Sequence, residues 1–490
     1  MIIKTSQDEI QNYLSDASNF KGFCESVYIP ENIDEVKNIL ATANKLNTSV
    51  TISGNGTGLT GARVPQGGIV ISTERLNKIH EINADEKYAV VEPGVMLSEL
   101  LSQLKQIKLL YPPDPTEKNC FIGGTIATNA SGEKTFRYGS TRDYILELEV
   151  ILTNGEAVNL KRGEKFADGY NIILQTDHNS IYSFDIPETV LSLTKNAAGY
   201  YCHKNMDIID LFIGSEGTLG VVTKAKLKLL PYPEKIISCV SFFMNENDAL
   251  SFINEARVLS RMNISGFSTS SINALALEFF DSNSLKFLFN DYPNIPELSG
   301  AAVWFEQETN IIGEETVLDE WTNLIKKHNG NTENVWFAFS ESEAEKIQKF
   351  RHSISANVNE FITRNNFRKL GTDVAVPDES FNALYHYSKK IAEEKNINYV
   401  VYGHFGNSHM HFNFLPETED EFIISKELYN NICLKAIELK GTVSAEHGLG
   451  KVKHDYLKLM YGDDDVKKML AIKKVLDPNL ILCKGNLFNL

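Results

Sequence analysis

The chain of 490 residues is too long for one ordinary hydrophobic core, so we expect two or three domains. Its 48 basic and 64 acidic side chains give a net charge of −16, which disfavours nucleic acid as a partner. No stretch approaches the roughly 18 apolar residues of a membrane-spanning helix, and the N-terminus turns polar too early for a secretory signal. The six cysteines form no C-x-x-C pair, so we expect reduced thiols in a cytoplasmic protein, with peripheral contact to the inner membrane left open.

The first part of the chain is predicted as strands with interleaved helices. Apolar residues at helical spacing predict a helix over 31–46, and the β-branched run that follows predicts a strand over 48–53. Further strands are expected at 67–73, at 87–94 and within 145–160, where Asn154-Gly155 predicts a hairpin turn. Pro231 and Pro233 then mark a break.

The rest of the chain has the texture of a separate α+β unit. Helical spacing predicts helices over 245–260 and 343–365, and apolar runs predict strands over 301–308 and 334–340. Near the C-terminus a helix is expected over 464–476, stopped by Asp477-Pro478.

A glycine-dense loop at 53–68 follows the first predicted strand. It contains G-x-G-x-x-G at residues 56–61, but a dinucleotide-binding fold needs a helix to begin there. Pro65, Gly67 and Gly68 exclude that helix, and a strand follows them. The glycines still allow backbone amides to approach a diphosphate closely, with Arg63 as the only cation. A plain tight turn is the equal alternative.

Three of the eleven histidines lie within eight positions, at His404, His409 and His411. If 408–412 is a strand, His409 and His411 share one of its faces. Glu446 and His447 stand next to each other further on. Imidazole nitrogens and carboxylate oxygens together are typical ligands of transition metals, whereas a histidine-rich strand without metal is the alternative.

Two more glycine-rich segments, 111–132 and 213–223, complete the pattern of motifs. With them the sequence resembles the FAD flavoproteins of the vanillyl-alcohol-oxidase (PCMH) type, in register from about residue 20 to the C-terminus. It is most similar to their branch of D-lactate, D-2-hydroxyglutarate and glycolate dehydrogenases. The resemblance implies an α+β fold with a two-subdomain FAD-binding domain over 1–232. A substrate domain with an antiparallel sheet and flanking helices would span 233–440, and a segment over 441–490 would pack back on the FAD domain.

The resemblance also implies which residues hold FAD. Loop 53–61 would surround the pyrophosphate, and the other two segments would hold the rest of the cofactor. The implied FAD-binding residues are Ser53, Gly54, Asn55, Gly56, Thr57, Gly58, Leu59, Pro113, Asp114, Thr116, Gly123, Gly124, Thr128, Asn129, Ser131, Glu216, Gly217 and Val221. Covalent relatives attach flavin through His or Cys, neither of which occurs in loop 53–61, so we expect FAD to bind noncovalently; Cys120 is a weak candidate for attachment.

The implied metal ligands are His404, His411 and Glu446, with Zn²⁺ favoured and Mn²⁺ or Fe²⁺ as alternatives. His447 matches the catalytic base of the family. The chain departs from the family at Asn407-Ser408-His409, where Asp-Gly-Asn is usual. His409 is thus open to three roles: an extra ligand, a group that orients a ligand, or a substrate contact.

Arg351 matches the family arginine that binds the substrate carboxylate. Ser355 lies four positions on, on the same face of the predicted helix, and Lys369 resembles a substrate lysine of some relatives. If the substrate has a second carboxylate, Lys369 or His409 could bind it.

The implied reaction is oxidation of a D-2-hydroxy acid to the 2-oxo acid, with D-lactate favoured and D-2-hydroxyglutarate or glycolate as alternatives. A non-redox metal-dependent hydrolase leaves the glycine segments unexplained. An ether-lipid synthase relative shares the FAD domain but does not account for Arg351. The electron acceptor is left open among a quinone, a cytochrome, an electron-transfer flavoprotein and oxygen. The oligomeric state is also open, a homodimer included.

Overall fold

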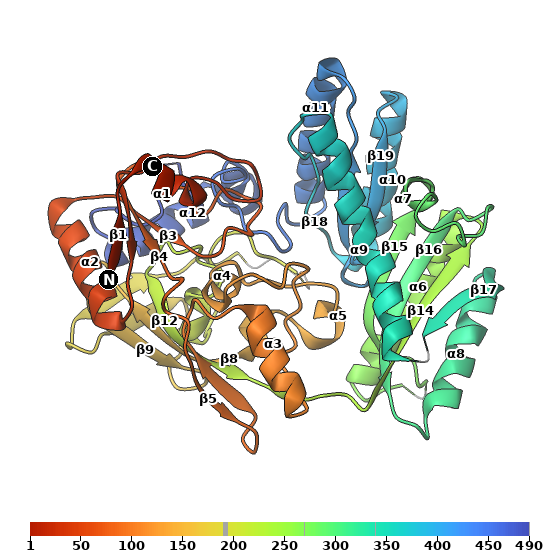
Figure 1. Cartoon of the computed structure of the whole chain (residues 1–490), viewed down its shortest axis with the longest axis horizontal. Helices are drawn as coiled ribbons and strands as arrows, with labels where there is room; N and C mark the ends of the chain where they lie inside the picture. Colours follow the sequence, from red (N-terminus) through yellow and green to blue (C-terminus); the bar gives the residue numbers. More distant parts are fainter. Residues whose placement is uncertain (190–194, 269, 339, 490) are drawn as a thin grey trace.

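The computed structural model describes residues 1–189, 195–268, 270–338 and 340–489 of the chain. Figure 1 shows two units side by side: the N-terminal part together with the end of the chain, and the middle of the chain. Antiparallel sheets with flanking helices confirm the predicted α+β fold. Within the described residues, every helix is too short or too polar to cross a lipid bilayer.

The N-terminal unit contains a four-stranded sheet in the order β1-β2-β4-β3. Its strands are β1 (Ile2–Lys4), β2 (Ser26–Ile29), β3 (Val50–Ser53) and β4 (Ile69–Ser72). The predicted helix is α2 (Ile33–Leu46), which begins where the Asn32 side chain accepts the Glu35 N–H and ends at Asn47 in the left-handed conformation. Since β4 is the first regular element after the glycine loop, the exclusion of a dinucleotide-binding fold is confirmed.

A five-stranded antiparallel sheet, in the order β5-β6-β12-β8-β9, forms the second part of this unit. Its strands are β5 (Ile79–Asn83), β6 (Tyr88–Val91), β8 (Ile145–Ile151), β9 (Ala157–Lys161) and β12 (Val221–Lys228). The predicted hairpin at Asn154-Gly155 joins β8 to β9. The short helix α4 (Ile122–Thr128) was not predicted, because Gly123 and Gly124 lower its helix propensity.

The middle unit is built on a seven-stranded sheet in the order β17-β14-β16-β15-β19-β20-β18. Its strands are β14 (Lys235–Phe243), β15 (Ala274–Asp281), β16 (Ala301–Thr309), β17 (Gly330–Ala338), β18 (Val374–Ala375), β19 (Tyr399–Gly403) and β20 (His409–Phe414). All neighbouring strands are antiparallel. The strand predicted at 334–340 is part of β17, and its position 339 lies outside the described residues.

Alternation along the strands gives this sheet two apolar faces. Trp304 of β16 is buried in the core that includes α7 (Ser282–Leu288) and α9 (Glu341–Arg364). The next residue, Phe305, stacks on Trp321 of α8 (Glu314–Lys327), beside α6 (Glu246–Ile264) and α10 (Phe381–Glu394). The predicted helices α6 and α9 are confirmed, and Figure 1 shows α9 as the long helix crossing the unit. Helix α11 (Glu419–Glu438) packs against α10.

The end of the chain lies in the N-terminal unit, where α12 (Tyr456–Leu476) packs against β11 (Ile181–Asp185). Helix α12 is longer than the predicted helix and contains a non-helical residue, Gly462. Beyond it, the Cys483 N–H donates to the Val50 carbonyl beside β3 at 2.7 Å. The domain boundaries at 232/233 and 440/441 stay a prediction.

Candidate active site

The predicted histidines meet at the junction of β19 and β20. His404 directly follows β19, a 3-10 turn over 405–407 reverses the chain, and His409 and His411 share a face of β20. Gly403 at φ 147° permits the reversal, since a Cβ there would lie 3.0 Å from the His409 carbonyl oxygen. The ring centroid of His411 lies 5.5 Å from that of His404 and 4.5 Å from that of His409.

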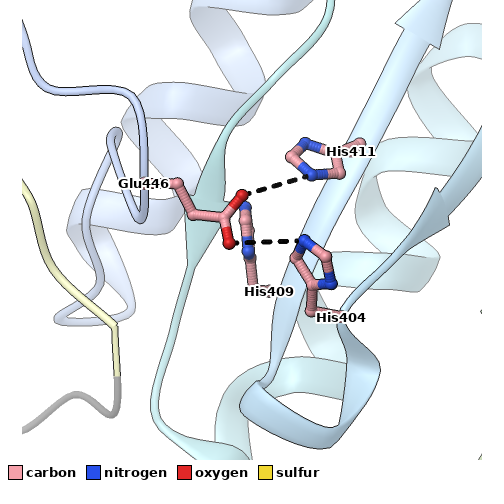
Figure 2. Close-up of side chains that lie close together, drawn as sticks. All are labelled: His404, His409, His411 and Glu446. Carbon is pink, nitrogen blue, oxygen red and sulfur yellow. Dashed lines mark ion pairs between the residues drawn. The ribbon is translucent and has the colours of Figure 1, made fainter. Parts of the chain in front are cut away.

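Glu446 approaches this cluster from the C-terminal segment. Figure 2 shows its carboxylate facing the rings, with Oε1 3.3 Å from His404 Nε2 and Oε2 4.0 Å from His411 Nε2. Lys195 Nζ lies 2.5 Å from Oε1, and the Ser131 hydroxyl donates to the same oxygen. Burial alone would raise the pKa of Glu446, but His404 and Lys195 outweigh it and hold the pKa well below its usual range. The carboxylate is therefore an anion.

A carbonyl or carboxylate oxygen fixes one nitrogen of each predicted histidine ligand. His404 Nδ1 lies 2.7 Å from Glu278 Oε1, and His411 Nδ1 lies 3.0 Å from the Thr372 carbonyl oxygen. Both partners are acceptors, so each Nδ1 carries a hydrogen and Nε2 is the nitrogen that faces Glu446. Burial alone would lower the pKa of His404, but Glu278 and Glu446 outweigh it and raise the pKa, so a metal ion at this Nε2 would replace a proton. Burial holds the pKa of His411 well below its usual range, so its ring is neutral.

The base predicted from the family, His447, lies beside the cluster. Its ring stacks on His411 with centroids 5.9 Å apart, and its Nδ1 lies 3.2 Å from Asp373 Oδ2. Burial lowers the pKa of His447. The side chain is 28% exposed, so it is more accessible than the three clustered histidines.

Arg351 of α9 is buried behind His404. Its Nε and Nη2 both lie 2.6 Å from Glu278 Oε2, and Nη1 has no hydrogen-bond partner among the described residues. The Ser355 hydroxyl donates to the Tyr402 hydroxyl at 3.0 Å, and the Tyr402 ring packs beside His411. Lys369 is half-buried on the side of His447. The structure thus brings all the predicted catalytic residues to one region, and their roles stay predictions.

The glycine-rich segments enclose a cavity of about 300 Å³. Most of the predicted FAD-binding residues line it: Gly54, Asn55, Gly56, Thr57, Gly58, Leu59, Thr116, Gly123, Gly124, Thr128, Ser131, Glu216, Gly217 and Val221. Glu446 and His447 line it as well. The cavity therefore borders the histidine cluster.

Four other predicted FAD-binding residues do not line this cavity. The Ser53 hydroxyl accepts a hydrogen bond from Arg63, and Pro113 is buried. Asp114 forms an ion pair with Lys118, and the Asn129 side chain accepts the Arg142 N–H. These four residues lie behind the lining residues and do not border the cavity themselves.

The glycines of the wall leave room for a ligand in the cavity. A Cβ placed on Gly124 would meet no atom within 4 Å, so this glycine leaves open space for a ligand. Arg63 donates to backbone carbonyls of Ser15 and Gly54, so it braces the loop. Cys120 also lines the cavity, and burial raises the pKa of its thiol to about 12. A neutral thiol is a poor nucleophile.

Residues 25–161 match the family model of the FAD binding domain, and residues 262–487 match that of the C-terminal domain of FAD linked oxidases. Glycolate oxidase subunit GlcD of Bacillus subtilis (strain 168) is 30% identical over 484 residues, which cover 97% of this chain and 92% of that relative. The chain belongs to the FAD-linked oxidase family. Membership makes the chain an FAD-binding protein of an oxidoreductase family, and the assignment of the cavity as the flavin site stays a prediction.

Other relatives in the FAD-linked oxidase family carry different substrate names. A D-lactate dehydrogenase of Anaerostipes hadrus is 27% identical, with 93% of this chain and 87% of the relative covered. A D-2-hydroxyglutarate dehydrogenase of Xanthomonas citri pv. viticola is 28% identical, with 94% and 89% covered. A solved structure of alkyldihydroxyacetonephosphate synthase shares the fold, with TM-score 0.69, 16% identity and 98% and 82% coverage. Membership therefore establishes the cofactor and the reaction class rather than one substrate.

Sequence reasoning gave no role to three buried charged residues of the site: Lys195, Glu278 and Asp373. Glu278 had a local signal, because it is a carboxylate flanked on both sides by apolar residues within strand β15. Asp373 and Lys195 lie in short polar stretches that carry no comparable signal. Their importance comes from contacts with residues far away in the chain.

Proposed function

We propose that this chain oxidises a D-2-hydroxy acid to the 2-oxo acid with noncovalently bound FAD, D-lactate being the favoured substrate. One observation carries the proposal: Glu446 and His447 line the glycine-rich cavity while Glu446 also faces His404 and His411. The FAD site of the family and a set of metal-binding side chains therefore share one wall.

His404 and His411 would hold a divalent ion through Nε2 and Glu446 through its carboxylate. Zn²⁺ is favoured, with Mn²⁺ and Fe²⁺ as alternatives, because imidazole and carboxylate together suit these metals. When bound, the ion polarises the substrate hydroxyl and the flavin accepts the hydride from Cα. All the other steps belong to side chains of the chain itself.

His447 would accept the hydroxyl proton. Asp373 fixes its Nδ1 as the protonated nitrogen, which leaves the lone pair on Nε2. The lowered pKa of His447 keeps the ring neutral at pH 7 and ready to take up a proton. Asp373 also accepts hydrogen bonds from the backbone N–H groups of Glu446 and His447, so it would fix the positions of the base and of one metal ligand relative to each other.

Arg351 would bind the substrate carboxylate, and Lys369 would bind a second carboxylate if the substrate has one. Glu278 takes up Nε and Nη2 of Arg351, and Nη1 has no described partner and can donate to a carboxylate oxygen. Ser355 would position the Tyr402 ring, which borders His411, through the hydrogen bond between the two hydroxyl groups. One metal ion and one arginine would suffice for a small monocarboxylate such as D-lactate. D-2-hydroxyglutarate and glycolate remain the alternative substrates.

The decisive experiment is anaerobic reduction of the purified flavoprotein. D-lactate, D-2-hydroxyglutarate, glycolate and L-lactate are added separately, and bleaching of the flavin absorbance is followed by stopped flow. D-lactate should bleach the flavin fastest. Bleaching by L-lactate alone would refute the stereochemistry, and no bleaching by any of the four acids would refute the reaction.

The metal assignment is tested by His404→Ala, with exposed His386→Ala as the matched control. His404→Ala should lose bound metal and activity yet retain FAD, while the control keeps all three. Unchanged metal content in His404→Ala would reject the assignment. The reduced flavin would pass its electrons to a quinone, a cytochrome, an electron-transfer flavoprotein or oxygen, and reoxidation by each in turn identifies the acceptor.

A further inference from the structure

The resemblance to hydroxy-acid dehydrogenases gives no role to His409, although this ring lies inside the histidine cluster. His409 is 0% exposed, and its ring centroid lies 5.1 Å from that of His404 and 4.5 Å from that of His411. Figure 2 shows it next to the carboxylate of Glu446. Glu446 and His447 line the glycine-rich cavity, whereas His409 does not.

Asp373 determines which nitrogen of His409 carries the hydrogen. His409 Nε2 lies 3.0 Å from Asp373 Oδ1, and the same carboxylate accepts the Ser444 hydroxyl and the His447 N–H. Because Asp373 acts as an acceptor throughout, Nε2 donates and Nδ1 keeps a lone pair. Among the described residues, that buried Nδ1 has no hydrogen-bond partner.

A buried lone pair without a partner is costly, and buried polar atoms in folded proteins are nearly always satisfied. His409 has the same arrangement as His404 and His411: one ring nitrogen bonds to a protein oxygen while the other is left for the cluster. This is how histidine ligands of metals are held, since the oxygen fixes the tautomer and the orientation of the ring.

The four side chains also have the spacing that a metal ion needs. One ligand atom from each of His404, His409, His411 and Glu446 lies within 4.8 Å of all the others. Tetrahedral bonds of about 2.0 Å place ligand atoms about 3.3 Å apart, so the widest of these separations would have to shorten by up to about 1.5 Å around an ion. His404 Nε2 and Glu446 Oε1 are already 3.3 Å apart.

We propose that His409 Nδ1 is a fourth protein ligand of the metal, which makes the centre a site of three imidazoles and one carboxylate. This inference rests on the metal centre of the proposed function and adds a ligand to it. Four protein ligands fill a tetrahedral ion, so a substrate hydroxyl has to enter as a fifth ligand. The additional nitrogen favours Zn²⁺ and Fe²⁺ over Mn²⁺.

The test counts imidazole ligands directly. The full-length flavoprotein is stripped of metal with a chelator and reloaded with Co²⁺ alone, and bound cobalt is measured by mass spectrometry. The ring N–H protons of histidines bound to Co²⁺ give strongly shifted proton NMR signals that disappear in D₂O. Wild type should show three such signals, one each from the N–H groups that face Glu278, Thr372 and Asp373.

Two variants and one control sharpen the count. His409→Asn and His409→Gln should each show two signals and bind Zn²⁺ more than about 100-fold more weakly, beyond the loss expected from a residue that only orients a ligand. Exposed His386→Asn should still show three. Both His409 variants should retain the FAD absorbance of the wild type, which shows that the fold survives.

Two shifted signals in the wild type would overturn the inference even if neither variant folds, and would indicate a buried water molecule on His409 Nδ1. That result would leave the proposed function intact, since His404 and His411 would account for both signals. No cobalt uptake at all would overturn this inference and the metal centre together, while flavin bleaching by D-lactate would still test the reaction independently.

Discussion

Glu278→Gln is expected to destabilise the protein strongly, because Glu278 is the buried anion that joins Arg351 to His404. Its side chain is 0% exposed, and both Arg351 and His404 lie within 2.7 Å of its oxygens. Burial raises the pKa of Glu278, but His404 and Arg351 outweigh it and lower the pKa to about 2, so the carboxylate is charged at pH 7. The amide would leave the Arg351 guanidinium buried without its anion. Breaking a buried ion pair in this way costs about 3–5 kcal/mol.

Urea denaturation at pH 7 measures the loss, followed by the far-ultraviolet circular dichroism of metal-free protein. The double variant Glu278→Gln/Arg351→Met removes both charges, so it should recover most of the free energy of unfolding. Glu360→Gln breaks the exposed ion pair with Arg364 and should change stability by less than about 0.5 kcal/mol. A loss below about 1 kcal/mol for Glu278→Gln, or a double variant no more stable than the single one, would refute the reasoning.

Three further predictions concern burial and the cavity. Burial raises the pKa of Asp281 from 3.8 to about 6. Between these two values the folded protein keeps a proton that the unfolded chain has released. The protonated carboxyl group therefore contributes fully to the free energy of unfolding below about pH 4, and this contribution is lost as the pH rises through 6. Wild type should therefore lose about 2 kcal/mol of unfolding free energy relative to Asp281→Asn between pH 4 and 7, measured by urea titration, and parallel curves would contradict this. Cys120→Ser should bind FAD like the wild type, and acid denaturation should release the FAD from both proteins. Flavin that stays on the denatured wild type but not on the denatured variant would show a covalent bond to Cys120. Gly124→Ala should leave the apoprotein as stable or up to about 1 kcal/mol more stable while weakening FAD binding in fluorescence titration, because its Cβ enters open cavity space inside a helix. Gly123→Ala, whose Cβ would meet Pro93 at 2.5 Å, should instead lower stability, and equal effects of the two alanines would contradict the assignment.

Local signals explain which elements could be predicted from the sequence. The helix α2 and the helix α9 have apolar periodicity and side-chain caps, with Asn32 for the first and Ser340 for the second. The helix α4 lacks both, since it begins after Phe121 without a side-chain cap and contains two glycines. Packing against the rest of the domain stabilises such a helix, and packing is a property of the fold rather than of the segment.

The same difference between local sequence signals and long-range contacts holds for the candidate active site. The shared face of His409 and His411 follows from strand alternation, and it was predicted correctly because the two residues are two positions apart. The carboxylate that orients His404 comes from β15, 126 positions away, and Lys195 reaches Glu446 across 251 positions. No local pattern encodes such pairs. Family motifs locate ligands along the chain, but the groups that set their charge and tautomer need the folded structure.

These distant partners decide what kind of ion the site can hold. Each of three buried carboxylates next to the histidines has its own buried cation: Glu446 pairs with Lys195 and Glu278 with Arg351. Asp373 lies 3.5 Å from the ammonium of Lys453. The negative charges are therefore already balanced, so a hard cation that depends on carboxylate charge, such as Mg²⁺ or Ca²⁺, has little to gain. Imidazole lone pairs remain as the main source of affinity, and they favour transition metals. A bound divalent ion then gives the site a net positive charge, which an anionic 2-hydroxy acid can compensate.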